Sequence, residues 1–159
     1  MGGDHACLCR RLYRRLDLDT QDAVHLAGIS YTKLVYGTNS GGAWSNTTIA
    51  TGFFDKDVDL AIDPSDYVHI AYISWSSPNA VRYASNETGS WVQETVDPWQ
   101  WIPPWVNGQY EPRITIDSTG EPVVCYNSAG DVISKGVPDA FSNFICGKKV
   151  NGSWNLEVV

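Results

Sequence analysis

The sequence lacks a long apolar run and is short of basic residues: 11 Lys and Arg stand against 18 Asp and Glu, a formal net charge of −7. A transmembrane helix needs about 20 consecutive apolar residues, so we expect no membrane partner. Nucleic acid is bound by a basic stripe that neutralises phosphates, and we expect none for this acidic chain. Residues 1–8 also lack the charged-then-apolar layout of a signal peptide, so we expect that export is not encoded there. We expect a soluble chain and leave its compartment unknown.

Cysteine is also scarce, with four in 159 residues. Cys7 and Cys9 lie near His5, but a single residue between two Cys is too short for the usual zinc knuckle, and no second ligand pair follows. We therefore interpret residues 1–14 as an irregular basic leader. We expect no metal and no cofactor.

Short apolar runs separated by turn residues fill the rest of the chain. Between residues 59 and 96, apolar runs are interrupted by Asp63-Pro64-Ser65-Asp66, by a loop with Trp75, and by the turn 86–89. Runs of this length bounded by Asp, Pro, Asn and Gly are typical of short antiparallel strands. This stretch therefore predicts four strands.

The same four-strand unit occurs three times in the sequence. Residues 16–30 match residues 60–74 without a gap, and residues 36–44 match 83–91. Downstream, residues 114–126 match 60–72 and residues 152–154 match 89–91. Three repeats of about 45 to 60 residues, each with four short strands, are typical of β-propeller blades. We predict an all-β fold of three four-stranded blades, at about 15–50, 57–96 and 110–159, with an inserted crossover at 97–109.

Residues that recur in every unit are interpreted as structural. The repeated Asp of the first turn is placed to cap free amides, and the repeated Trp can fill the space between neighbouring sheets. His25 and His69 occupy equivalent mid-strand positions, where the third unit has Val123. We therefore predict neither a metal nor a catalytic role for these two His.

Cys125 and Cys146 fall on the second and third strands of the third unit, which are hairpin partners. A disulfide forms if the strand register brings them opposite each other. Two buried thiols are the alternative. The sequence leaves both open.

Insertions gather in the loops of one face. Antiparallel connectivity places the loops between second and third strands, and the crossovers between blades, on the same face; 74–79, 97–109 and 127–143 all belong to them. These segments carry four tryptophans: Trp75, Trp99, Trp101 and Trp105. Exposed aromatics on loops suit stacking against a sugar ring, so we predict the ligand site here. The alternative is that these Trp pack over the gap between blades or form a subunit contact.

Polar groups are expected near the same face, close to the central axis. Arg15, Asp59 and Arg113 are equivalent in the three units, and Glu111 lies two residues earlier. Arg recognises acidic or hydroxylated ligands through paired hydrogen bonds, so these residues are candidate ligand-binding groups. The alternative is a network of ion pairs between blades.

The strand–Asp turn–strand pattern and the Gly-Ser-Trp turn, over residues 15–159, resemble the BNR or Asp-box repeats of the sialidase superfamily. Arg113-Ile114 also resembles the start of that family's Arg-Ile-Pro motif. The resemblance implies a β-propeller fold. We carry two functions: a non-catalytic, carbohydrate-binding propeller, and a degenerate or unusual sialidase-like glycoside hydrolase that uses the axial Arg and carboxylate groups.

Three blades cannot close a ring, because each blade needs a neighbour on both faces to cover its apolar side chains. We predict a homodimer in which blade three of each chain packs against blade one of the other, closing a six-bladed ring. The alternative is that this chain is a piece of a longer propeller.

Overall fold

The computed structural model describes residues 13–30, 32–76, 79–98, 111–128 and 143–159. These residues form three four-stranded antiparallel sheets, each built from consecutive strands of the chain. The predicted all-β unit of three four-stranded repeats is confirmed. Within the described ranges there is no helix with the length and apolar character needed to cross a membrane. Residues 1–12 of the predicted leader and 99–109 of the predicted crossover lie outside these ranges.

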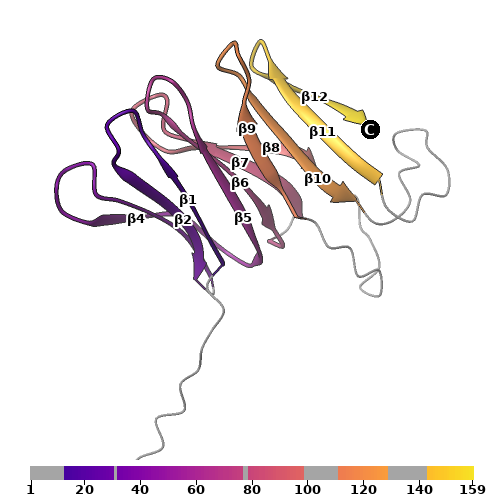
Figure 1. Cartoon of the computed structure of the whole chain (residues 1–159). Coiled ribbons are helices and arrows are strands. Elements are labelled where there is room, and N and C mark those ends of the chain that lie inside the picture. The colour runs from indigo at the N-terminus through magenta and orange to yellow at the C-terminus, as the bar shows by residue number, and fades with distance from the viewer. Residues whose placement is uncertain (1–12, 31, 77–78, 99–110, 129–142) are drawn as a thin grey trace, which may run out of the picture.

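The sheets stand side by side in chain order (Figure 1). The first sheet consists of β1 (Tyr13–Leu18), β2 (Val24–Ser30), β3 (Lys33–Thr38) and β4 (Ser45–Thr51). The second consists of β5 (Phe54–Ile62), β6 (Val68–Ser74), β7 (Ala80–Ser85) and β8 (Val92–Pro98). The third consists of β9 (Arg113–Ile116), β10 (Pro122–Ser128), β11 (Asn143–Val150) and β12 (Ser153–Val158).

Several sheet limits differ by a few residues from the sequence prediction, and two of them enter segments that were predicted as leader and crossover. β1 begins at Tyr13, inside the predicted leader, because Tyr13 is still paired with Ile29 of β2. β8 continues to Pro98, inside the predicted crossover, because one extra residue of β8 opposite Val81 and Arg82 shifts the register and lets Pro98 pair with Ala80. In both places the ladder with the neighbouring strand extends the element beyond the apolar pattern.

The first turn of every sheet is built in the same way. Oδ1 of Asp19 accepts hydrogen bonds from two backbone amides of its own turn, and Oδ1 of Asp63 and of Asp117 does the same. Three residues further along, the chain takes a left-handed φ, at 61° for Asp22, 64° for Asp66 and 87° for Gly120. Asp and Gly tolerate this conformation. The structural interpretation of the repeated Asp is therefore confirmed.

The second sheet is packed on both faces, and the burial pattern of its strands reflects this packing. Every residue of β6 is buried, whereas exposure alternates along β2 of the first sheet. A strand covered on both sides needs a continuous apolar run, and a strand covered on one side needs alternation. One core lies between the first and second sheets, around Leu34, Tyr36, Ile70 and Tyr72. A second lies between the second and third sheets.

A Trp of each later sheet packs against a Tyr of the sheet before it. Trp91 meets Tyr36 edge-on with ring centroids 5.0 Å apart, and Trp154 meets Tyr83 in the same way at 5.2 Å. The repeated Trp therefore fill space between sheets at these two positions. Trp44 is the exception and is 59% exposed, because the first sheet has no earlier sheet in the described part of the chain.

We predict that Trp91→Ala lowers the free energy of unfolding by about 3 kcal/mol, the low end of the range for a large aromatic, because Trp91 is only half-buried. Trp75→Ala is the control and should cost less than about 1 kcal/mol, because its side chain lies outside both cores. Urea denaturation measures both values. Equal losses for the two variants would contradict the packing role assigned to Trp91.

Candidate functional site

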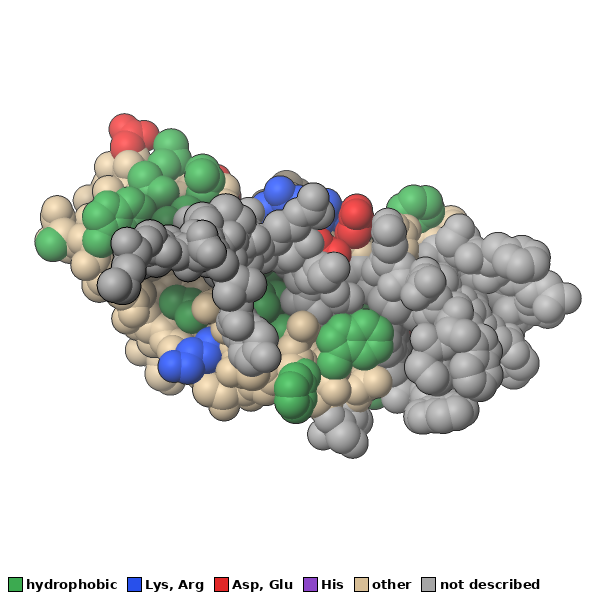
Figure 2. Space-filling view, turned by 90° about the horizontal axis from the view of Figure 1, so that it is seen from below, with side chains coloured by type: hydrophobic (Ala, Val, Ile, Leu, Met, Phe, Trp, Pro, Cys, Tyr) green, Lys and Arg blue, Asp and Glu red, His purple; other side chains and the backbone are tan. Residues whose placement is uncertain are grey.

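Two exposed aromatic side chains lie at the end of the molecule that carries the insertions. Trp75 follows β6 and is 41% exposed, and Phe53 precedes β5 and is 70% exposed. The amide of Trp75 donates to the carbonyl of Phe53 at 2.8 Å, and the amide of Phe53 donates to Ser76 Oγ at 2.9 Å. These bonds hold the loop after β6 against the connection between the first and second sheets. Figure 2 shows this end, where apolar side chains lie in separate patches among polar groups.

Of the four Trp predicted for this face, the described residues include Trp75 alone. Trp99, Trp101 and Trp105 fall in the range 99–110, outside the described residues. The site proposed from the sequence therefore rests, in this structure, on Trp75 and on Phe53, which the sequence analysis missed. The signal that could have found Phe53 is its place in the short connection between two strands at the same end.

Two of the residues predicted to lie near the axis, Arg15 and Asp59, join neighbouring sheets. Arg15 Nε lies 3.5 Å from Asp59 Oδ1, and Asp59 Oδ2 accepts a hydrogen bond from the amide of Ile114 at 3.1 Å. Both carboxylate oxygens of Asp59 thus contact neighbouring strands, β1 on one side and β9 on the other. Its side chain is only 15% exposed. This geometry matches the alternative of an ion pair between sheets.

Arg113 and Glu111 form a separate and more exposed pair. Arg113 Nη2 lies 3.6 Å from Glu111 Oε2, and Arg113 Nη1 donates to the carbonyl of Pro112 at 2.9 Å. Nearly half of each side chain is exposed. The structure therefore brings Arg15 to Asp59 and Arg113 to Glu111, as two separate ion pairs within the described residues.

A buried chain of Asp, His and Tyr occurs in the first and second sheets. His25 Nδ1 lies 2.6 Å from the Tyr36 hydroxyl, and His25 Nε2 lies 3.1 Å from Asp19 Oδ2. The hydrogen bond to His25 holds the pKa of the Asp19 carboxyl below its ordinary value. The chain joins the first turn to β2 and β3. The sequence predicted a structural role for both His, but the hydroxyl partner emerged only from the register of the strands.

The second sheet repeats this chain with one difference. His69 Nδ1 lies 2.6 Å from the Tyr83 hydroxyl, as in the first sheet, but His69 Nε2 is 3.5 Å from Asp63 Oδ2 and has no hydrogen-bond partner. Burial is the main cause that lowers the pKa of His69. Burial likewise raises the pKa of Tyr83 above its ordinary value.

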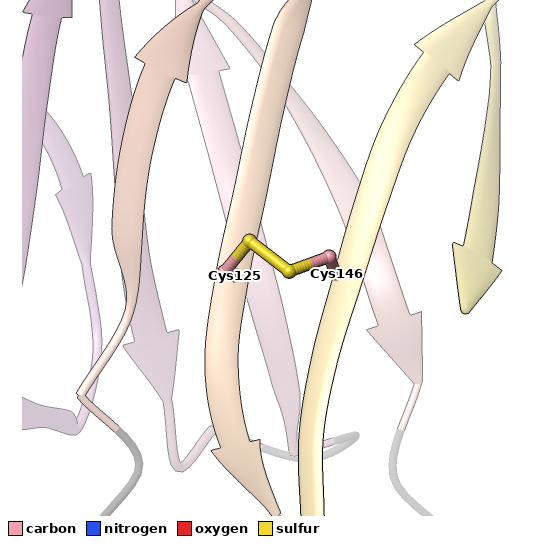
Figure 3. Close-up of a disulfide and its surroundings, with 2 residues drawn as sticks. All are labelled: Cys125 and Cys146. Atoms are coloured by element: carbon pink, nitrogen blue, oxygen red, sulfur yellow. A yellow bond between two sulfur atoms is a disulfide. The ribbon is translucent and has the colours of Figure 1, made fainter. Parts of the chain in front are cut away.

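The third sheet replaces this chain with a disulfide. Ala27 is paired with Tyr36 and Ala71 with Tyr83 across the two middle strands; the equivalent pair in the third sheet is Cys125 and Cys146. Their Cα atoms are 4.1 Å apart and the sulfur atoms are bonded (Figure 3). Of the two alternatives left open by the sequence, the structure has the disulfide. It links β10 and β11 where the other sheets use a His–Tyr hydrogen bond.

A cavity of about 460 Å³ lies on the outer face of the first sheet, and its lining includes Leu26, Gly28, Gly37 and Trp44. Gly28 stands where the second and third sheets carry Tyr72 and Tyr126, so this face lacks one large side chain. The cavity therefore lies on the face of the first sheet whose equivalents in the second and third sheets are buried. A smaller cavity of about 330 Å³ lies at the opposite end from the insertions, between the turns that contain Asp19, Asp63 and Asp117. A ligand site on the insertion-bearing face stays a prediction.

Comparison with known proteins supports the fold. No family model and no curated protein matches the chain. A solved structure, that of a fucose lectin from Kordia zhangzhouensis in complex with methyl-fucoside, matches with a TM-score of 0.53 over 91% of this chain and 96% of that chain, at 14% identity. The fold thus defines an all-β protein of three repeated four-stranded sheets, similar in fold to that lectin. The resemblance to sialidase-superfamily repeats stays a prediction.

Asp117, in the first turn of the third sheet, should make the stability of the fold depend on pH. The Lys148 ammonium, and then the Thr119 hydroxyl, hold the pKa of the Asp117 carboxyl well below its usual range. A carboxylate with a lowered folded-state pKa contributes stability that is fully present above its unfolded pKa of about 4 and is lost as the pH falls further.

We therefore predict that the difference in Tm between wild type and Asp117→Asn is constant above about pH 5 and shrinks below about pH 4. Thermal unfolding from acid to neutral pH measures it. Lys148→Gln removes the first cause of the lowered pKa of Asp117. In a chain that carries Lys148→Gln, adding Asp117→Asn should therefore change the Tm by less than it does in the wild type. Parallel curves for wild type and Asp117→Asn over the whole range would refute this assignment.

Proposed function

We propose that this chain is a non-catalytic carbohydrate-binding protein. The observation that carries the proposal is the fold match to the fucose lectin, which extends over nearly the whole of both chains. The exposed aromatic residues at the insertion-bearing end support it. Lectin sites commonly combine an aromatic platform for the apolar face of the sugar with a few polar groups for its hydroxyls.

The proposed platform consists of Trp75 and Phe53. A backbone hydrogen bond joins the two residues, the Phe53 amide also donates to the Ser76 hydroxyl, and both aromatic side chains keep a large exposed fraction. Trp99, Trp101 and Trp105 belong to the crossover that joins β8 to β9, which the sequence assigns to the same face. We include them in the proposed site on that ground.

The runner-up function, a glycoside hydrolase, is less well supported. Such enzymes use two carboxyl groups placed on either side of the scissile bond. Asp59, the central carboxylate of the predicted axial set, accepts contacts on both oxygens from neighbouring strands. Withdrawing it from those contacts for proton transfer would weaken the joints between all three sheets.

The prediction for binding is that Trp75→Ala weakens the affinity for the bound sugar about tenfold, the effect of losing about 1.4 kcal/mol of aromatic contact. Methyl-fucoside, followed by a glycan array, provides the probes, and calorimetry gives the affinity. Tyr67→Ala is the matched control, because Tyr67 is 40% exposed but lies beside the first turn of its sheet, at the other end.

Failure to bind any glycan on the array would overturn the proposal. An equal loss in Trp75→Ala and Tyr67→Ala would move the site away from the insertion-bearing face. Release of product from a panel of fluorogenic glycosides would favour the hydrolase instead.

We further propose that two chains close a six-bladed propeller, with the third sheet of each packed against the first sheet of the other. Both interfaces within the chain place a Tyr of the earlier sheet against a Trp of the later one. On the outer faces, the corresponding positions hold Cys146 and the exposed Trp44. In the proposed dimer, the disulfide of one chain therefore packs against Trp44 of the other chain, where a Tyr packs against Trp within the chain.

The sizes of the outer side chains are also complementary. Leu34 and Tyr72 share the first core, and Val81 and Tyr126 share the second. On the outer face of the third sheet, Phe144 is equivalent to Leu34 and Val81 and is 60% exposed. On the outer face of the first sheet, Gly28 is equivalent to Tyr72 and Tyr126 and leaves the 460 Å³ cavity. A larger residue on one face and a smaller one on the other preserve the volume that close packing requires.

This assembly predicts a mass twice the 17.5 kDa of the chain in light scattering at micromolar concentration. Phe144→Asp should give a monomer, because a carboxylate cannot be buried there without a partner. Gly28→Tyr alone should also weaken the dimer by filling the cavity, and Gly28→Tyr combined with Phe144→Val should restore it. A monomeric wild type, or a dimer indifferent to both positions, would overturn the interface.

A further inference from the structure

We propose that Asp63, His69 and Glu87 form a binding site for a divalent transition-metal ion of the Zn²⁺ type in the second sheet. One ligand atom from each residue lies within 4.8 Å of the other two. The three residues come from different elements: the first turn, β6, and the turn between β7 and β8. The site lies at the end of the molecule opposite the proposed carbohydrate site.

An unpaired buried nitrogen points to the ligand. His69 is completely buried, and its Nε2 atom has no hydrogen-bond partner. A buried polar atom without a partner is costly and calls for an explanation, such as an ion or water that completes its coordination. His69 Nε2 and Asp63 Oδ2 are 3.5 Å apart. Two tetrahedral ligands at the usual Zn–N and Zn–O distances stand about 3.3 to 3.5 Å apart.

The first sheet shows what the same motif does without the third ligand. There, His25 Nε2 lies 3.1 Å from Asp19 Oδ2 and makes a hydrogen bond. The position of Glu87 is taken by Ser40, which has no carboxylate. The second sheet therefore differs from the first in two linked respects: it carries an additional acidic side chain, and the His–Asp contact is wider.

The surroundings of His69 prepare it as a ligand. Its Nδ1 is bound to the Tyr83 hydroxyl at 2.6 Å, which fixes the orientation of the ring as outer partners of metal-bound His do. Oδ1 of Asp63 accepts hydrogen bonds from the amides of Ser65 and Tyr67, so Oδ2 is the oxygen that faces the imidazole ring of His69. A neutral imidazole with two carboxylates suits Zn²⁺ and its neighbours among the divalent metals.

Glu87 supplies the adjustable ligand. Its side chain is exposed, and Ser85 Oγ donates to Glu87 Oε2 at 3.2 Å. Rotation of this side chain can close the remaining distance to the ion, and its exposure leaves a coordination position for water. A bound ion would join both turns of the second sheet to β6, where the first sheet has only the His–Asp hydrogen bond.

The experiment is a calorimetric titration of Zn²⁺ into the full-length, EDTA-treated chain carrying His5→Ala, Cys7→Ser and Cys9→Ser, which removes other metal ligands near the N-terminus. We expect one Zn²⁺ per chain and a higher Tm in its presence. Glu87→Gln should weaken the affinity at least about tenfold. Asp63→Asn should weaken it as well, whereas Asp19→Asn, the equivalent change in the first sheet, should leave it unchanged.

The ring resonances of the two His distinguish this site from binding elsewhere. Zn²⁺ should shift those of His69 and leave those of His25 in place. The proposal is overturned if Zn²⁺ leaves the His69 signals unchanged, which is the result expected when water alone satisfies Nε2. It is equally overturned if Glu87→Gln binds as tightly as the parent chain.

Discussion

Burial of both faces of the second sheet is the interaction on which the rest of the structure depends. Its central strand β6 is buried at every residue, and the two hydrophobic cores lie on either side of it. Apolar burial contributes about 25 cal/mol per Å², and a four-stranded sheet alone covers neither of its faces. Among the described residues, each outer sheet has one face covered by the second sheet and the other face open. Exposed Leu16, Trp44 and Phe144 are the direct result.

The sheets share a turn design but differ in how their middle strands are joined. In the first two, a His–Tyr hydrogen bond crosses these strands, and the Tyr ring also receives the Trp of the next sheet. In the third, a disulfide joins the pair that corresponds to Ala and Tyr in the other two sheets. Tyr therefore appears where a later sheet of the same chain packs. The sheet without such a neighbour has Cys125 and Cys146 instead.

The two ends of the molecule serve different purposes. At the turn end, side chains are engaged in capping amides and in the buried Asp–His pairs, which makes this end a structural frame and, in the second sheet, a proposed metal site. At the other end, Trp75 and Phe53 remain exposed on connections of unequal length. Loops that vary on a repeated scaffold are where binding commonly evolves. Asp59 lies between these regions and is used to join strands.

The sequence by itself determined the three repeats, their strands and their turns, because a turn depends on a few neighbouring residues and a strand on its apolar pattern. It also placed Arg15 near Asp59 through their equivalent positions. Tertiary structure alone decided that these two form an ion pair, that Cys125 meets Cys146, and that Trp44 is exposed while its counterpart Trp91 packs on Tyr36. The repeat makes these two Trp equivalent in sequence. Their environments differ because burial depends on which sheet lies opposite, and no local pattern records that.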